Sequence, residues 1–100
     1  MVVELVEAYR YDKMAEGKLS QPKYALRQVF INPEHVVFLR EDIFYKKVLK
    51  EGYFKDMDLR QSFTKIYMNR GQMGIDLVVV GSPSIVQEKL GLNKQQLLKG

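Results

Sequence analysis

Hydrophobic and polar residues alternate along much of the chain, which is the pattern of β-strands with one buried face. Residues 2–11 alternate in part, and the runs YALRQVFI at 24–31 and VVFLRE at 36–41 are rich in the β-branched and aromatic residues that strands favour. Segment 12–23 contains Gly, Ser and Pro with little apolar content, which predicts a loop. One side of the first expected strand carries Val3, Leu5, Tyr9 and Tyr11.

The polar and rigid segment NPEH separates the second and third expected strands. Pro33 has no N–H and a fixed φ, so it ends a strand, and Asn32 favours turns because its side chain bonds the backbone two residues on. We therefore expect Asn32 and Pro33 to form a structural turn. His35 is the single histidine, and the sequence offers it no metal-binding or acid–base partner at a recognisable spacing. We expect it to be an exposed turn residue.

Segment 42–61 admits two interpretations. Asp42 suits the cap of a short helix in which apolar residues recur every four positions, lysines gather toward the end and Gly52 stops the helix. The same residues could instead prolong the third strand into a long exposed arm. The spacing favours the helix, and residues 53–61, which have no clear period, predict a loop.

The clearest hairpin of the chain lies in its second half. Residues 62–69 and 75–81 predict two strands joined by RGQMG, where Gly71 or Gly74 supplies the positive φ of a tight turn. One face of the first of these strands carries Thr64, Ile66 and Met68, and the other carries Phe63, Lys65 and Tyr67.

A helix is expected after the hairpin. Ser82 is a good N-cap, Pro83 suits the first helical position and Gly91 fits the residue just past the end. Asn93 is expected to cap a further short turn that carries Leu97 and Leu98.

Together these elements predict a single, mainly β domain over residues 1–100, with an insert or arm at 42–61. Five short strands with hairpin connections and a terminal helix indicate a bent antiparallel sheet or a partly open barrel of the Sm or SH3 type. The 100 residues are 46% hydrophobic, which is enough for a core without metal or disulfide, and there is no Cys. The N-terminal segment lacks the pattern of a signal peptide and no stretch is long enough to span a membrane, so we expect a cytoplasmic protein.

Residue patterns for catalysis, metals and cofactors are not found. The adjacent carboxylates Glu41 and Asp42 would point to opposite faces of a strand, and the DMD segment at 56–58 is typical of a solvated loop. No His or Cys set has zinc spacing, and no glycine-rich loop precedes a helix. We therefore expect no cofactor and no enzymatic activity.

Binding is the stronger class. The net charge is +4, and the middle third of the chain interleaves basic and aromatic residues, as single-stranded nucleic acid requires for its phosphates and bases. The alternative is that Phe63 and Tyr67 pack under the insert or against a neighbouring subunit, while the lysines are solvated. The candidate nucleic-acid-binding residues are Lys65, Tyr67, Arg70, Lys46 and Lys47.

Two short motifs resemble known families. The pattern F-x-N-P-E-x-V, followed by VVVGSPSIVQEKL, resembles the small flagellar-operon proteins of the FlbD type, in which an Asn-Pro-acidic turn precedes a β-hairpin and a short helix. The loop at 12–23 and the insert at 42–61 are longer than in that family, and the resemblance implies no catalytic residue. Met68-Asn69-Arg70-Gly71 is similar to the Arg-Gly element of Sm-type RNA-binding proteins.

The hypothesis placed first is a non-enzymatic β module that acts through self-assembly or protein–protein interaction. Strands that are apolar on more than one face leave surface uncovered in a small sheet, and free sheet edges offer unpaired backbone groups to another copy. We therefore expect a homo-oligomer, with a further protein partner as an option. Binding of RNA or single-stranded DNA is the alternative.

Overall fold

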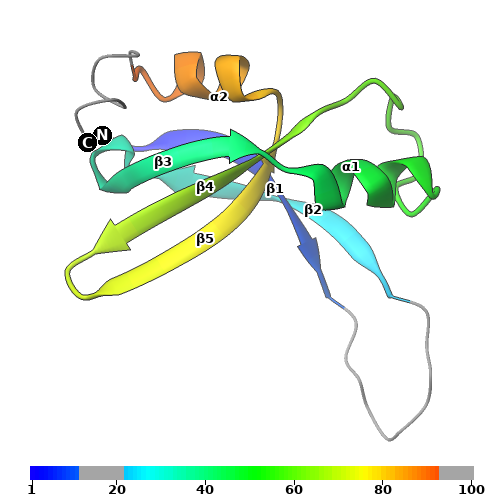
Figure 1. Cartoon of the computed structure of the whole chain (residues 1–100), viewed down its shortest axis with the longest axis horizontal. Coiled ribbons are helices and arrows are strands. Elements are labelled where there is room, and N and C mark those ends of the chain that lie inside the picture. The colour runs from blue at the N-terminus through cyan, green and yellow to red at the C-terminus, as the bar shows by residue number, and fades with distance from the viewer. Residues whose placement is uncertain (12–21, 93–100) are drawn as a thin grey trace, which may run out of the picture.

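A computed structural model describes residues 1–11 and 22–92. It confirms the mainly β fold: five antiparallel strands form one sheet, accompanied by two short α-helices and a 3-10 turn (Figure 1). The elements in chain order are β1 (Val3–Arg10), β2 (Tyr24–Ile31), η1 (Pro33–His35), β3 (Val36–Glu41), α1 (Ile43–Lys50), β4 (Phe63–Arg70), β5 (Met73–Val80) and α2 (Pro83–Lys89).

The sheet is bent and unclosed, with strand order β2-β1-β5-β4-β3. β1 and β2 pair along their full length, as do β4 and β5. The two ribbons join only where Glu7 and Ala8 face Val79 and Val78, and beyond this crossing they diverge (Figure 1). β2 and β3 are consequently the two free edges, and the sheet is not a closed barrel.

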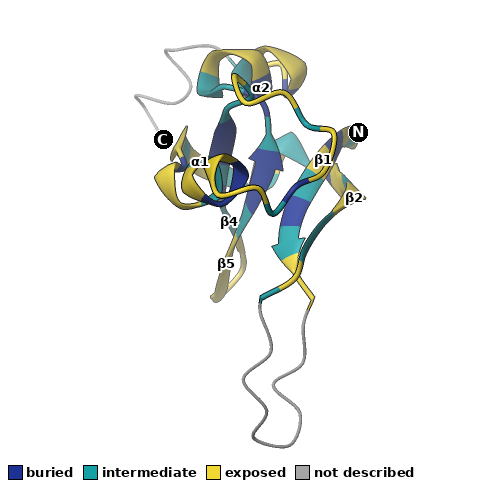
Figure 2. Ribbon diagram, turned by 90° about the vertical axis from the view of Figure 1, so that its right-hand side faces the viewer, coloured by how far each residue is buried: buried dark blue, intermediate teal, exposed yellow. Residues whose placement is uncertain are grey.

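Each face of the sheet has its own core because neighbouring residues of a strand point to opposite faces. On one face, α2 packs over a first core, which consists of Leu5, Ile31, Ile66, Val79, Val86 and Leu90. On the other face, α1 and the segment after it cover a second core, which consists of Ala8, Val48, Leu49, Phe54, Phe63 and Val78. Figure 2 shows these buried parts of the strands between the two helices, whereas the tip of the β4–β5 hairpin is exposed.

The helical interpretation of the segment after Asp42 is confirmed, and the exposed arm is not formed. The carboxylate of Asp42 accepts a hydrogen bond of 2.8 Å from the backbone N–H of Tyr45, which satisfies one of the free donors of the first turn. α1 ends as predicted near Gly52, which has a φ of +88°. The following segment is irregular, but Phe54 is buried in the second core.

The two turns predicted from proline and glycine are also present. The side chain of Asn32 accepts a hydrogen bond from the N–H of Glu34 and begins the 3-10 turn with Pro33 at its first position. In the β4–β5 hairpin, Gly71 supplies the positive φ, at +68°, but the strands run closer to the turn than predicted. Gly74 lies within β5.

The predicted helix after the hairpin is confirmed as α2. The hydroxyl of Ser82 accepts a hydrogen bond from the N–H of Ile85, and Gly91, with a φ of +70°, follows the end of the helix. Most of the loop predicted at 12–23, and the short turn predicted to follow Asn93 with Leu97 and Leu98, lie outside the described residues.

Candidate nucleic-acid interface

Two aromatic rings stack on the open part of the sheet, in neighbouring strands. Phe38 of β3 stands opposite Tyr67 of β4, and their ring centroids are 4.2 Å apart with an angle of 27° between the planes. Tyr67 points to the same face as the second core, but it lies four residues beyond Phe63, about 13 Å along the strand. Phe38 keeps 40% of its surface exposed. We call this pair the Phe38–Tyr67 platform.

A β-bulge in β3 creates this platform. Val36 stands opposite Met68, but the register then shifts, so that Phe38 stands opposite Tyr67 and Leu39 opposite Ile66. Without the extra residue at Val37, Phe38 would point toward the first core. Bulges re-aim side chains in this way at sheet edges. The shift allows Leu39 to pack against the first core while Phe38 joins Tyr67 on the opposite face.

Two cationic side chains flank the platform. Arg40 and Lys65 stand opposite each other on the face that carries the rings. Each lies two residues along its strand from Phe38 or Tyr67. The Arg40 Nη2 atom donates a hydrogen bond of 3.3 Å to the hydroxyl of Tyr67, and its guanidinium lies 5.5 Å from the Tyr67 ring centroid. The Lys65 Nζ atom lies 5.8 Å from the same centroid. Both positions lie within the range of cation–π attraction.

Beside Tyr67, toward the hairpin turn, the surface is open. Asp76 of β5 stands directly opposite Tyr67, and Gly74 is the next residue of β5 on this face. Because Gly74 has no side chain, a hollow of about 530 Å³ borders Tyr67, lined also by Ile75 and Asp76. The Asp76 carboxylate is a negative group at the edge of an otherwise cationic site.

The structure divides the predicted nucleic-acid-binding residues into separate groups. Lys65 and Tyr67 lie together at the platform. Arg70 shares the face of Ile66 and Met68, so it points to the opposite side of the sheet. The sequence placed Arg70 in the turn after residues 62–69, so this separation was not predicted; β4 in fact continues to Arg70. Phe38 and Arg40 were also missed, because the bulge that turns them toward Tyr67 has no signature in the sequence.

The two predicted lysines of α1 differ in role. The Lys46 Nζ atom donates hydrogen bonds to the carbonyl oxygens of Leu59, at 2.8 Å, and Gln61, at 2.7 Å. It therefore ties α1 to the irregular segment that leads into β4. Lys47 is exposed on the same helix.

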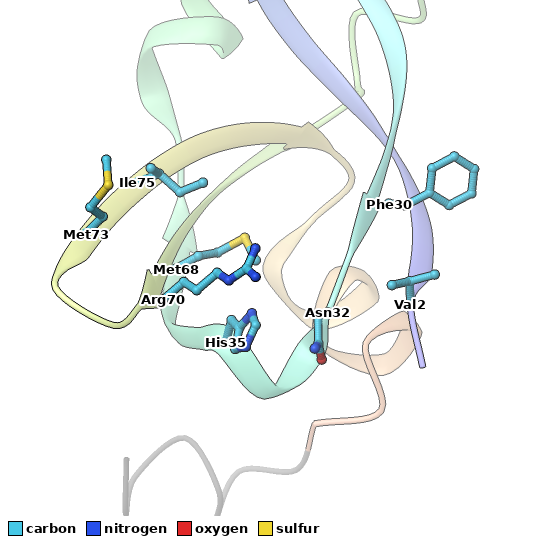
Figure 3. A pocket seen from close by; sticks show the side chains of 8 residues that line it. All are labelled: Val2, Phe30, Asn32, His35, Met68, Arg70, Met73 and Ile75. Atoms are coloured by element: carbon cyan, nitrogen blue, oxygen red, sulfur yellow. The ribbon is translucent and has the colours of Figure 1, made fainter.

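Arg70 lines an open cavity of about 570 Å³ at the far end of the sheet from α1 (Figure 3). Met68, Met73 and Ile75 of the hairpin form one side of the cavity, and Phe30, Asn32 and Val2 form the other, with His35 at its edge. The described residues that line this cavity include no carboxylate, serine or threonine beside His35. Within the described part of the chain, no group of three acidic or histidine side chains is arranged to hold a metal.

The other aromatic residues of the basic segment belong to the second core. Phe63 is fully buried, and its ring centroid lies 5.9 Å from that of Phe54. The ring of Tyr24 contacts those of Tyr45 and Tyr53 edge to face. Burial raises the pKa of the Tyr45 hydroxyl above its ordinary value. Phe63 packs under the segment after Asp42, as the alternative interpretation of the sequence required, whereas Tyr67 is half-buried and lies outside the second core.

Comparisons of the chain with protein-family models, with curated proteins and with solved structures found no match. The resemblances to FlbD-type and Sm-type proteins therefore stay predictions. In the described segments, neither helix has the length and hydrophobicity needed to cross a membrane.

Proposed function

We propose that the protein is a binding module for single-stranded nucleic acid, with the Phe38–Tyr67 platform as its contact surface. The observation that carries this proposal is the combination of stacked rings and two cations on a part of the sheet that neither core occupies. Aromatic side chains accept unpaired bases by stacking, and adjacent cations bind the phosphates. Bases inside a duplex are stacked on each other, so the single strand is the form that such a surface accepts.

The expected recognition tolerates many sequences. Every base has a π-face that can stack on Phe38 or Tyr67, and the hollow beside Gly74 leaves room for a second base. The net charge of +4 adds attraction over a longer range. Arg40 is the side chain best placed to bind a phosphate next to a stacked base, because its guanidinium lies over both rings, at 5.7 Å from Phe38 and 5.5 Å from Tyr67.

Fluorescence anisotropy with labelled oligo-dT and oligo-U, and with a duplex for comparison, tests this function. At about 50 mM salt we expect measurable binding of the single strands, which weakens steeply as salt is added. Tyr67→Ala should cost about 1–3 kcal/mol of binding free energy through lost stacking. Arg40→Gln should reduce the slope of log K against log salt by about one. Absence of binding to any single strand at this salt would remove the proposal.

The matched control for Arg40→Gln is Lys89→Gln. Lys89 is exposed on α2, which covers the first core on the opposite face of the sheet. Both changes remove one positive charge, but only the first touches the platform. Equal losses in the two variants would mean that net charge rather than the platform governs binding. Circular dichroism should show the same folded spectrum for all variants.

Self-assembly, the main hypothesis from the sequence, is a second candidate function, and it is compatible with nucleic-acid binding. It is favoured by the free edge of β2, where Leu26 and Phe30 expose 41% and 61% of their surfaces. Light scattering tests it: we expect a mass above the 11.7 kDa of one chain, whereas a monomer at high concentration would contradict it.

A further inference from the structure

The two free edges of the sheet differ in their suitability for pairing with another strand. β3 has six residues, and the bulge at Val37 breaks its regular pairing. β2 has eight residues and pairs with β1 without any shift of register, and no proline interrupts it. Bulges and short length protect an edge from pairing, whereas a long regular edge invites it. β2 is therefore the edge open to a further strand.

The hydrogen-bonding pattern shows which backbone groups of β2 point outward. The N–H of Tyr11 donates to the carbonyl oxygen of Lys23, at 3.0 Å, just beyond the last paired residues of the two strands. Hydrogen-bonded pairs alternate along an antiparallel ladder. It follows that the backbone groups of Ala25, Arg27 and Val29 bond to β1. Those of the residues between and beyond them, Leu26, Gln28 and Phe30, point to the free edge.

These three residues are also exposed, as is Arg27 on the other face of the strand. Leu26, Gln28 and Phe30 point away from the first core, to which Val29 and Ile31 contribute. Among the residues that the structure describes, no backbone hydrogen bond occupies the outward groups of these three. Unpaired backbone groups and two exposed apolar side chains thus occur together at one edge.

We propose that β2 pairs antiparallel with β2 of a second copy of this chain, about a two-fold axis that passes through Gln28. This inference rests on the self-assembly named above and specifies its interface. In this register, Gln28 stands opposite Gln28 of the second copy, and Leu26 stands opposite Phe30 of the second copy, twice by symmetry. Each of these pairs exchanges both of its N–H···O bonds, and one sheet continues through both copies.

Side-chain chemistry selects this register over its neighbours. The pairing between the two strands can shift only by two residues at a time, which moves the axis by one residue. A shift of the pairing by one residue is excluded, because residues that face each other must point to the same side of the sheet. An axis through Arg27 would set the two Arg27 guanidinium groups opposite each other, although each is also bonded to Glu7 of its own chain. An axis through Val29 would set Phe30 against the polar Gln28. Of these three axes, only the one through Gln28 sets the exposed apolar side chains of Leu26 and Phe30 opposite each other and separates the two guanidinium groups, each of which then stands opposite Val29.

Single cysteines test the register, because the natural chain contains no Cys. Residues in a hydrogen-bonded pair have Cα atoms about 5.5 Å apart, which a disulfide can bridge. Under mild oxidation of the full-length protein, Gln28→Cys should form a disulfide-linked dimer several-fold more readily than Lys89→Cys, which reports random collisions, or Arg27→Cys, which reports the shifted register. Leu26→Cys and Phe30→Cys should each crosslink poorly alone and efficiently when mixed.

The outcomes separate this inference from self-assembly in general. Preferential crosslinking of Arg27→Cys would overturn the register. An oligomer in light scattering without crosslinking at any β2 position would overturn the interface while self-assembly stands. A monomer in light scattering without crosslinking would overturn both. Circular dichroism before oxidation should show that each cysteine variant has the fold of the parent chain.

Discussion

The hydroxyl of Thr64 donates a hydrogen bond of 2.8 Å to the carbonyl oxygen of Gly81, and both residues are buried. The N–H of Gly81 donates in turn to the carbonyl oxygen of Ser62, at 2.9 Å. The chain therefore leaves β5 bound to the start of β4 at two points, and α2 is directed over the first core. A φ of +124° at Gly81 makes the sharp change of direction possible.

We expect Thr64→Val to lower the free energy of unfolding by about 1–3 kcal/mol, because it leaves the buried carbonyl oxygen of Gly81 without its partner. Valine has nearly the shape of threonine, so packing changes little. Urea denaturation measures the effect. Thr64→Ser keeps the hydroxyl and serves as the control, and an equal loss in both variants would contradict the role of the hydrogen bond.

The N-cap of α1 supports a second stability prediction. Asp42→Ala removes the acceptor for the N–H of Tyr45 and should cost about 0.5–2 kcal/mol of unfolding free energy. Asp42→Asn keeps a capping oxygen and should retain most of the stability. Since α1 covers the second core, hydrogen exchange should show that the alanine variant loses more amide protection around Leu49 than around Val86, each compared with the parent chain. Uniform loss of protection in both cores would contradict a local effect.

Lys46 and Lys47 form a matched pair for substitution. Lys46→Met should lower the free energy of unfolding by about 1–2 kcal/mol, because the carbonyl oxygens of Leu59 and Gln61 lose their charged donor. Lys47→Met, on the exposed side of the same helix, should change it by less than about 0.5 kcal/mol. Thermal and urea unfolding compare the two, and similar effects would show that the Lys46 hydrogen bonds add no stability.

The loop carboxylate of Asp58 gives a pH-dependent prediction. Hydrogen bonds from the Arg60 side chain and backbone N–H lower the pKa of Asp58 below its ordinary value. A pKa lowered by folding means that the stabilisation is present above the pKa of the unfolded chain and is lost as pH falls through the folded pKa. In an NMR titration, Arg60→Gln should move the Asp58 midpoint upward. An unchanged midpoint would rule out the Arg60 side chain as the cause.

Asp76 offers a gain-of-affinity test of the proposed nucleic-acid surface. Its carboxylate stands opposite Tyr67 and repels phosphate, so Asp76→Asn should tighten the binding of single-stranded oligonucleotides several-fold at low salt. Glu88→Gln removes the same charge from α2, on the opposite side of the sheet, and should have a smaller effect. Anisotropy titrations at matched salt compare them. Equal gains would assign the effect to net charge alone.

Local sequence signals predicted most of the elements. β2 and β3 have the predicted bounds, and the caps at Asp42 and Ser82 and the turn at Asn32 are formed by the predicted side chains. These features depend on residues within a few positions of each other. The choice between helix and arm after Asp42 does not follow from local signals alone, because the helix depends on the packing of Leu49 against strand residues such as Phe63 in the second core.

The candidate site was predicted only in part. Lys65 and Tyr67 were identified from the interleaving of basic and aromatic residues, but their neighbours Phe38 and Arg40 come from another strand. The register between two strands, and the bulge at Val37 in particular, follows from the simultaneous packing of both faces. No local pattern of residues contains that information.

The sequence by itself determined the strands, the helix caps and the alternation of residues within each strand, because these follow from intrinsic backbone preferences and the geometry of single elements. Only the tertiary structure decided which strand lies beside which, that Phe38 meets Tyr67 while Arg70 faces the other way, and that β2 keeps a free edge. These relations join residues far apart in the chain, and their energies exist only once both faces of the sheet are packed.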